Sequence, residues 1–162
     1  MSIQIRPART GDEADIVDMI HQLAAFERAP EECTVTQTQI AAALFGSDTH
    51  EPVASCHIAE VDGVVAAMAL WFRSFSTWDG VAGIHLEDLF VRAEFRRRGL
   101  ARALLATLAR VCVDNGYSRL GWAVLDWNTD AITLYDDVGG RPMSEWISYR
   151  VSGPELSALA ES

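Results

Sequence analysis

The stretch LEDLFVRAEFRRRGLA, residues 86–101, decides the fold predicted for this chain. Its apolar beginning predicts the end of a strand, and Leu100, Leu104 and Leu108 then follow helical spacing. Backbone N–H groups at a helix start lack intrahelical partners, the helix dipole adds positive charge, and a glycine such as Gly99 lets an anion approach. Neighbouring arginines donate to phosphate oxygens in pairs. The stretch therefore predicts a phosphate-binding turn, although three adjacent arginines are also consistent with a solvated turn.

The charge of the chain is acidic but unevenly distributed. Its 13 basic and 23 acidic side chains give a formal net charge of −10, and every basic residue is an arginine. This balance argues against a nucleic-acid-binding protein, and the absence of lysine excludes Schiff-base and P-loop mechanisms. Five of the arginines lie at positions 92, 96, 97, 98 and 102. The positive charge is thus concentrated at the predicted phosphate site.

Length and composition favour a single domain over residues 1–162. A hydrophobic content of 49% in 162 residues can fill one core. The N-terminus lacks a signal-peptide pattern and no apolar run reaches the roughly 20 residues of a membrane span, so we expect a cytoplasmic protein without membrane contact. The cysteines and histidines show no spacing typical of ligands, which predicts neither disulfides nor a metal site.

Hydrophobic periodicity predicts the elements on both sides of the loop. Strands are expected at residues 3–5, 54–61, 64–75, 83–91, 120–125 and 146–151. Helices are expected from Asp12, as the N-cap, toward Pro30, from about Thr36 to Gly46, from Leu100 to Gly116, and at residues 129–138. Asp62-Gly63 predicts a tight turn between two strands. This order predicts a mixed α/β sheet.

Three motifs occur in order and at fitting separations. They are residues 86–91, LEDLFV; residues 96–101, with the pattern R-x-x-G-x-A; and Trp127-Asn128-x-x-Ala131-Ile132-x-x-Tyr135. Together they resemble the GCN5-related N-acetyltransferase (GNAT) superfamily. Residues 5–8 (IRPA), 23–27 (LAAFE) and 126–128 (DWN) make the chain most similar to the spermidine/spermine and thialysine N-acetyltransferase branch. The chain departs from the pattern at Ala101, where a glycine is usual, at His85, where a tyrosine is frequent, and after Gly139.

The resemblance implies an α/β fold with a mixed, mostly antiparallel central sheet flanked by helices, and an acetyl-CoA site at its strand-loop-helix. It also implies that the backbone at Leu89, Phe90 and Val91 pairs with the pantetheine amides of acetyl-CoA. The other cofactor-binding positions it implies are Arg96, Arg97, Arg98, Gly99, Leu100, Ala101, Arg102, Asn128, Ala131 and Tyr135. Asn128 is equally placed to cap the following helix.

Acetyl transfer to an amine requires a proton acceptor for the amine and a proton donor for the departing thiolate. The resemblance assigns the first role to Glu87, directly or through water, and the second to Tyr135. A strand-surface carboxylate and a core tyrosine are the structural alternatives. Phe26, Glu27, Glu87 and Asp88 match positions that contact the amine in the resembled branch.

The predicted activity is therefore acetyl-CoA-dependent N-acetylation of a primary amine, with a polyamine or lysine-like amino acid as acceptor. Other acceptors, such as an amino acid, an antibiotic amine or a protein amino group, stay open. A non-catalytic acyl-CoA-binding domain is a further alternative, because a fold does not fix a function. The resembled branch also implies a homodimer.

Overall fold

A computed structural model describes residues 1–162. The chain forms two compact units, Met1–Asn128 and Thr129–Ser162. No helix in the structure combines the length and the apolar character that crossing a membrane requires.

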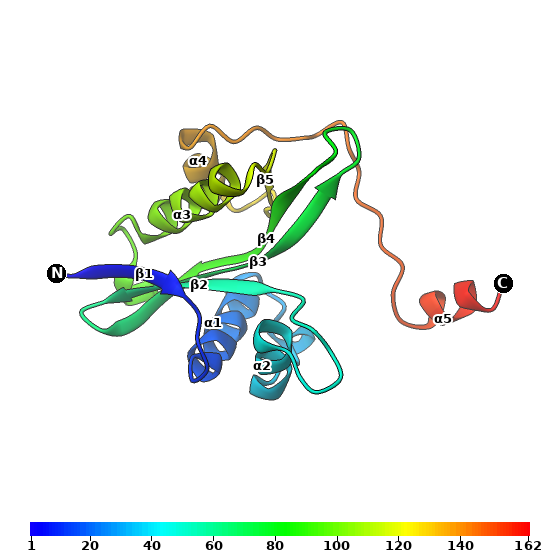
Figure 1. Ribbon diagram of the computed structural model, residues 1–162, viewed down its shortest axis with the longest axis horizontal. Helices are drawn as coiled ribbons and strands as arrows, with labels where there is room; N and C mark the ends of the chain where they lie inside the picture. Colours follow the sequence, from blue (N-terminus) through cyan, green and yellow to red (C-terminus); the bar gives the residue numbers. More distant parts are fainter. The chain divides into compact units, whose positions relative to one another are not determined.

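The first unit is built on a five-stranded sheet with the strand order β1-β2-β3-β4-β5 (Figure 1). The first four strands pair antiparallel with their neighbours, whereas β5 pairs parallel with β4. The strands are β1 (Ile3–Pro7), β2 (Ser55–Val61), β3 (Val64–Ser76), β4 (Val81–Val91) and β5 (Leu120–Gly121). The predicted mixed, mostly antiparallel sheet is confirmed.

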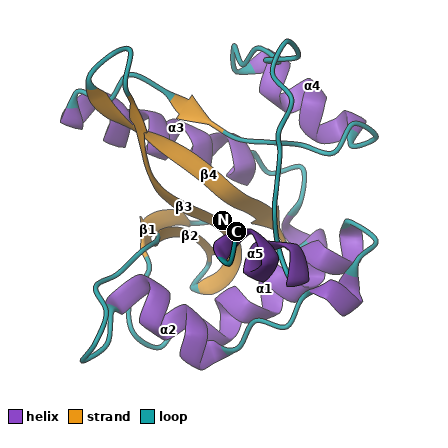
Figure 2. Ribbon diagram, turned by 90° about the vertical axis from the view of Figure 1, so that its right-hand side faces the viewer, coloured by secondary structure: helices purple, strands orange, loops and turns teal.

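Helices cover both faces of this sheet. Figure 2 shows α1 and α2 on one face and α3 on the opposite face. Their bounds are α1 (Glu13–Phe26), α2 (Gln37–Phe45) and α3 (Leu100–Asn115), with short 3-10 turns at Pro30–Glu32 and Ala93–Phe95. The helices therefore lie where the hydrophobic periodicity predicts them.

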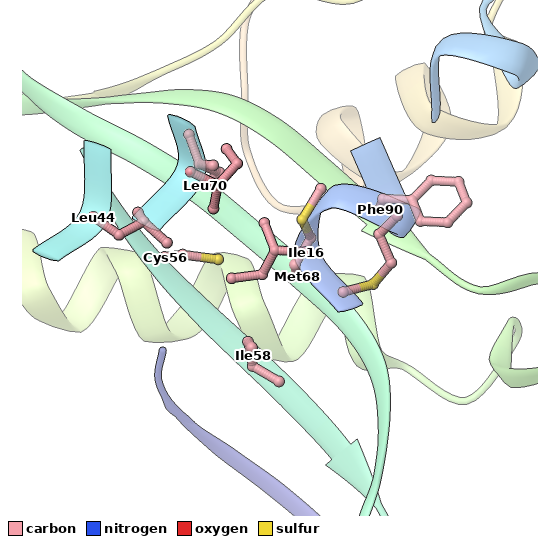
Figure 3. Packing of buried hydrophobic residues seen from close by; sticks show 9 residues of the cluster. Ile16, Leu44, Cys56, Ile58, Met68, Leu70 and Phe90 are labelled. Carbon is pink, nitrogen blue, oxygen red and sulfur yellow. The ribbon is translucent and has the colours of Figure 1, made fainter. Parts of the chain in front are cut away.

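The core lies between the sheet and these helices. On the α1 and α2 face it contains Ile16, Met19, Ile40, Leu44, Cys56, Ile58, Met68, Leu70 and Phe90 (Figure 3). On the other face α3 buries Leu100, Leu104, Leu105, Leu108 and Cys112. Burying a side chain of this size contributes roughly 1.5–3 kcal/mol, so the apolar stripe of α3 holds the start of that helix at the end of β4.

Local sequence explains several of the boundaries. Thr36 and Gln39 form a reciprocal capping box at the start of α2, and α3 ends at Gly116 with a left-handed φ of 69°. Asp62 and Gly63 both have positive φ, 50° and 81°, as the tight hairpin turn requires. The predicted start of α2, the predicted end of α3 and the predicted turn are confirmed, and each depends on neighbours in the chain.

Asp12 stands at the N-cap position of α1, but its side chain does not cap the helix. Its carboxylate instead accepts hydrogen bonds from the Arg6 guanidinium, at 2.7 and 2.9 Å, and from the Arg9 backbone N–H at 2.7 Å. Arg6 also pairs with Glu60 on β2. Because a charge-assisted pair is stronger than an ordinary cap, Asp12 joins β1 and β2 to α1.

Two strand predictions are wrong. The strand expected at 120–125 is limited to the two residues of β5, and residues 146–151 form no strand. Trp146, Ile147 and Tyr149 are instead exposed. A strand needs a partner for its backbone groups, and alternation in the sequence does not supply one. The second unit contains two helices, α4 (Thr129–Asp137) and α5 (Pro154–Ala160), of which only α4 is predicted.

Candidate active site

The start of α3 is open to an anion. Gly99 precedes the helix with a left-handed φ of 77° and ψ of 8°, and a Cβ added there would meet no atom within 4 Å. No side chain caps this helix start and its first turn carries no acid. By contrast, α1 begins with Glu13 and Asp15, and α2 has its capping box. The positive end of the α3 dipole is therefore not compensated by an acid or a side-chain cap.

The arginines of this region have different roles. Arg92 belongs to the fold, because its guanidinium pairs with Asp15 at 2.8 Å and with Asp18, both on α1. Arg96 donates from Nε to the Val91 carbonyl, and Arg98 donates to the Glu94 carbonyl, both at 3.1 Å. Arg97 has a positive φ of 62°, an uncommon backbone conformation for a residue with a side chain.

Strands β4 and β5 separate just before the loop. Their pairing is limited to Ile84 with Leu120 and His85 with Gly121, so no strand lies beside the outer edge of β4 after His85. Leu89, Phe90 and Val91 lie along this edge and pair on their other side with β3. An unpaired strand edge can form backbone hydrogen bonds with an extended ligand, which is the role predicted for these residues.

A β-bulge places Glu87 at the surface. Trp71 pairs with Leu86 and Leu70 pairs with Asp88, so Glu87 has no residue opposite it on β3. Its side chain is 56% exposed, and its Oε2 lies 3.4 Å from Nε2 of His85. Bulges of this kind redirect side chains and are common beside active sites. His85, one of the departures from the family pattern, is therefore a titratable neighbour of the predicted base.

Asp88 lies with Glu27 and Glu87 in a group of carboxylates, called the acid cluster below. Asp88 shares its face of β4 with Phe90, which packs in the core under α1, and Glu27 follows the last residue of α1. Burial, together with the charges of Glu87 and Glu27, raises the pKa of Asp88 to about 6. Desolvation also raises the pKa of Glu27, although its side chain stays partly exposed. Since a bound cation would relieve this repulsion, the acid cluster favours a positively charged ligand.

Aromatic rings and guanidinium groups form a row of contacts beside the acid cluster, in which the Phe26 and Trp127 rings are tilted by 45°. The Phe26 and Trp127 ring centroids are 5.7 Å apart. The Cζ atom of Arg28 lies 4.2 Å from the centre of the Trp127 ring, and that of Arg96 lies 5.6 Å from the Phe26 ring. The charge of Arg96 therefore faces Phe26, a predicted substrate contact, although its residue type and position predict phosphate binding.

The remaining predicted residues lie at and beyond the end of the first unit. Asn128 is its last residue and directly precedes α4. Ala131 and Tyr135 are half-buried and four residues apart on α4, so they share one face of that helix. The Tyr135 carbonyl accepts a hydrogen bond from the Gly140 N–H at 2.9 Å, which closes the end of α4.

The sequence analysis assigns no binding role to Arg28 or Trp127. Nothing in the sequence distinguishes Arg28 from the other 12 arginines, and the only feature that singles out Trp127 is its place in a motif. Their contact joins the end of α1 to the loop before α4, two segments that are distant in the chain. A periodic pattern cannot reveal such a pair, because it reports only on neighbours within one element.

Comparisons with known proteins give consistent results. The model of the acetyltransferase (GNAT) family matches residues 17–139. A thialysine N-epsilon-acetyltransferase of Caenorhabditis elegans is 36% identical over 156 residues, covering 94% of each chain. An L-ornithine N5-acetyltransferase of Arabidopsis thaliana is 28% identical over 201 residues, covering 98% of this chain and 88% of that protein.

Solved structures share the fold. An integron cassette protein from the mobile metagenome of V. cholerae aligns with a TM-score of 0.81 at 22% identity, covering 100% of this chain and 99% of the other. An aminoglycoside N-acetyltransferase in complex with CoA aligns with a TM-score of 0.72 at 21% identity, covering 93% of this chain and 95% of the other. These alignments confirm the predicted fold class.

Proposed function

This chain belongs to the acetyltransferase (GNAT) family and is an N-acetyltransferase, and from that premise we propose that it acetylates a small cationic amine with acetyl-CoA. The acceptor class we propose is a polyamine or a lysine-like amino acid. The order of features along β4 carries the proposal. Glu87 and Asp88 of the acid cluster are followed by the open strand edge at residues 89–91 and then by the uncapped start of α3.

The open start of α3 fits the pyrophosphate of acetyl-CoA. We propose that the backbone from Gly99 to Arg102 and the side chains of Arg97 and Arg98 bind its phosphates, because no acid in the first turn competes for that position. Arg96 would contribute through its backbone and through its position over Phe26. Leu89, Phe90, Val91, Asn128 and Ala131 would bind the pantetheine arm. We propose that residues 1–162 act as one N-acetyltransferase domain, because the family model spans residues 17–139.

Bound acetyl-CoA supplies an acetyl group activated as a thioester. The residues of the chain then have two proton transfers to perform. We propose that Glu87 accepts a proton from the acceptor ammonium, directly or through water, and that the Tyr135 hydroxyl donates one to the departing sulfur. Asp88 is a second candidate for the base, because a pKa of about 6 leaves it ionised yet basic near neutral pH.

The acid cluster supports a cationic acceptor. Three carboxylates, two of which the fold partly desolvates, attract an ammonium group and place it beside the predicted base. The net charge of −10 adds a long-range attraction for cations. The relatives named for thialysine and L-ornithine likewise support an amine acceptor.

A panel of amines tests this function. Release of free thiol from acetyl-CoA is measured with spermidine, putrescine, lysine, ornithine, S-(2-aminoethyl)cysteine, an aminoglycoside and a peptide amine. We expect release with the small cationic amines. Absence of release with every amine would contradict catalysis, whereas efficient use of only the aminoglycoside or the peptide would contradict the acceptor class. Light scattering on the same sample tests the expected homodimer.

A further inference from the structure

A row of four side chains in contact borders the acid cluster, in the order Arg28, Trp127, Phe26 and Arg96. The neighbouring members lie 4.2, 5.7 and 5.6 Å apart by the measures given above. A guanidinium group therefore stands at each end. The Arg96 end is also bound to the Val91 carbonyl, whereas the Arg28 end is exposed and makes no ion pair.

The backbone at Arg28 is strained. Its φ is +66°, and the neighbouring Ala29 N–H closes the end of α1 on the Ala24 carbonyl at 3.0 Å. Glycine is the ordinary residue at such a position, because an L side chain there costs about 1–2 kcal/mol. The chain thus carries a long cationic side chain at a position where the backbone conformation favours glycine. Strain of this kind is often found at ligand-binding sites.

The Arg28 charge is separate from the acid cluster. Arg28 forms no ion pair with Glu27, Glu87 or Asp88, and the raised pKa values of Glu27 and Asp88 are caused by burial and by neighbouring carboxylates. A guanidinium paired with either carboxylate would lower that pKa instead. The site therefore presents two distinct charges: an acid cluster that attracts an ammonium group, and a guanidinium fixed on an indole ring.

We propose that Arg28 is a specificity-determining residue, which binds the carboxylate of a diamino-acid acceptor whose distal amine lies at the acid cluster. This inference rests on the acetyltransferase function proposed above. The contact with the Trp127 ring restricts the guanidinium group and so reduces the entropy lost when it donates two hydrogen bonds to a carboxylate. The same charge repels the second ammonium group of a diamine or polyamine. Arg28 therefore favours amino-acid acceptors and also disfavours diamines and polyamines.

Pairs of acceptors that differ by one carboxylate test the proposal. Lysine is compared with cadaverine and ornithine with putrescine, since each diamine is the decarboxylated form of its amino acid. We expect wild type to prefer the amino acid of each pair in kcat/KM. Arg28→Gly should lower kcat/KM for lysine and ornithine by about tenfold to a hundredfold, mainly through KM, because a charge-assisted pair is lost. The same variant should leave the diamines unchanged or improve them.

Three comparisons make the result specific. Arg28→Lys keeps the charge but not the bidentate geometry, so it should restore part of the preference. Arg110→Gln removes an exposed arginine from α3 and controls for the change in net charge. Arg28→Gly also relieves the positive φ, so its melting temperature should be at least that of wild type.

The outcomes separate this inference from the proposed function. The proposal for Arg28 is overturned if wild type uses the diamines as efficiently as the amino acids, or if Arg28→Gly affects both members of each pair equally. In either case acetyl transfer itself stands. If no amine releases thiol even with wild type, the proposed function fails and takes this inference with it.

Discussion

Two glycines at opposite ends of α3 provide a matched test of the cofactor site. Gly99 precedes the helix with a φ of 77°, and Gly116 follows it with a φ of 69°. A Cβ at either position would meet no atom within 4 Å. Gly99→Leu and Gly116→Leu therefore introduce the same backbone strain and no clash of the Cβ, but only Gly99 lies at the predicted phosphate site.

The magnitudes follow from these angles. A left-handed conformation costs an L-residue about 1–2 kcal/mol. In a chain of this size about 1 kcal/mol shifts the melting temperature by roughly 2–4 °C, so both variants should melt roughly 2–8 °C below wild type without ligand. Acetyl-CoA at a hundred times its Kd stabilises the native state by about 2.7 kcal/mol, which corresponds to a rise of roughly 5–11 °C.

The assay is thermal melting with and without acetyl-CoA. We expect wild type and Gly116→Leu to show the full ligand-induced rise, and Gly99→Leu to show little or none, because its side chain fills the space in front of the helix start. A full rise with Gly99→Leu would refute the placement of the phosphates at α3. Loss of the rise in both variants would mean that strain in α3, not the site, controls binding.

Three further predictions concern the chemistry. Tyr135→Phe should lower kcat by about 10²-fold while the acetyl-CoA-induced melting shift is kept, as expected for a proton donor; near-normal turnover would indicate that solvent protonates the sulfur. Asp88→Asn should stabilise the fold above pH 6 and have little effect below pH 4, because the native state favours the protonated acid and the cost of ionising it appears as the pH rises through its folded pKa. The difference between the ordinary value of 3.8 and about 6 corresponds to at most about 3 kcal/mol, measured by urea unfolding at pH 4 and pH 8. Glu27→Gln should raise KM for a cationic acceptor with kcat largely kept, whereas Glu87→Gln should lower kcat and shift its pH profile upward. If the two variants change KM and kcat to the same extent, Glu27 does not act only in binding and Glu87 is not distinguished as the base.

The elements that the sequence predicts are those whose cause is local. The capping box of Thr36 and Gln39, the Asp62-Gly63 turn and the glycine after α3 each depend on residues a few positions apart. The strand expected at 146–151 is wrong because alternation describes a strand's faces and leaves its pairing partner open. For the same reason the parallel pairing of β5 stops after two residues, although apolar residues continue beyond it.

The candidate site divides in the same way. The motifs at residues 86–91 and 96–101 predict a strand, an anion-binding loop and a helix, because the proposed phosphate contact would be made by consecutive backbone groups. They also name Glu87 and Asp88. They do not predict that a bulge exposes Glu87 beside His85, or that burial raises the pKa of Asp88 to about 6.

The sequence by itself determined the family, the elements from β1 to α3 and the position of the proposed anion-binding loop, since each is encoded by spacing along the chain. Only the tertiary structure decided which charges stand together. It placed Glu27 near Asp88, paired Arg92 with Asp15 of α1, and brought the Arg28 guanidinium into contact with the Trp127 ring. The physical reason is that Coulomb and desolvation energies depend on distance and solvent exposure in space, and residues far apart in the chain acquire both only when it folds.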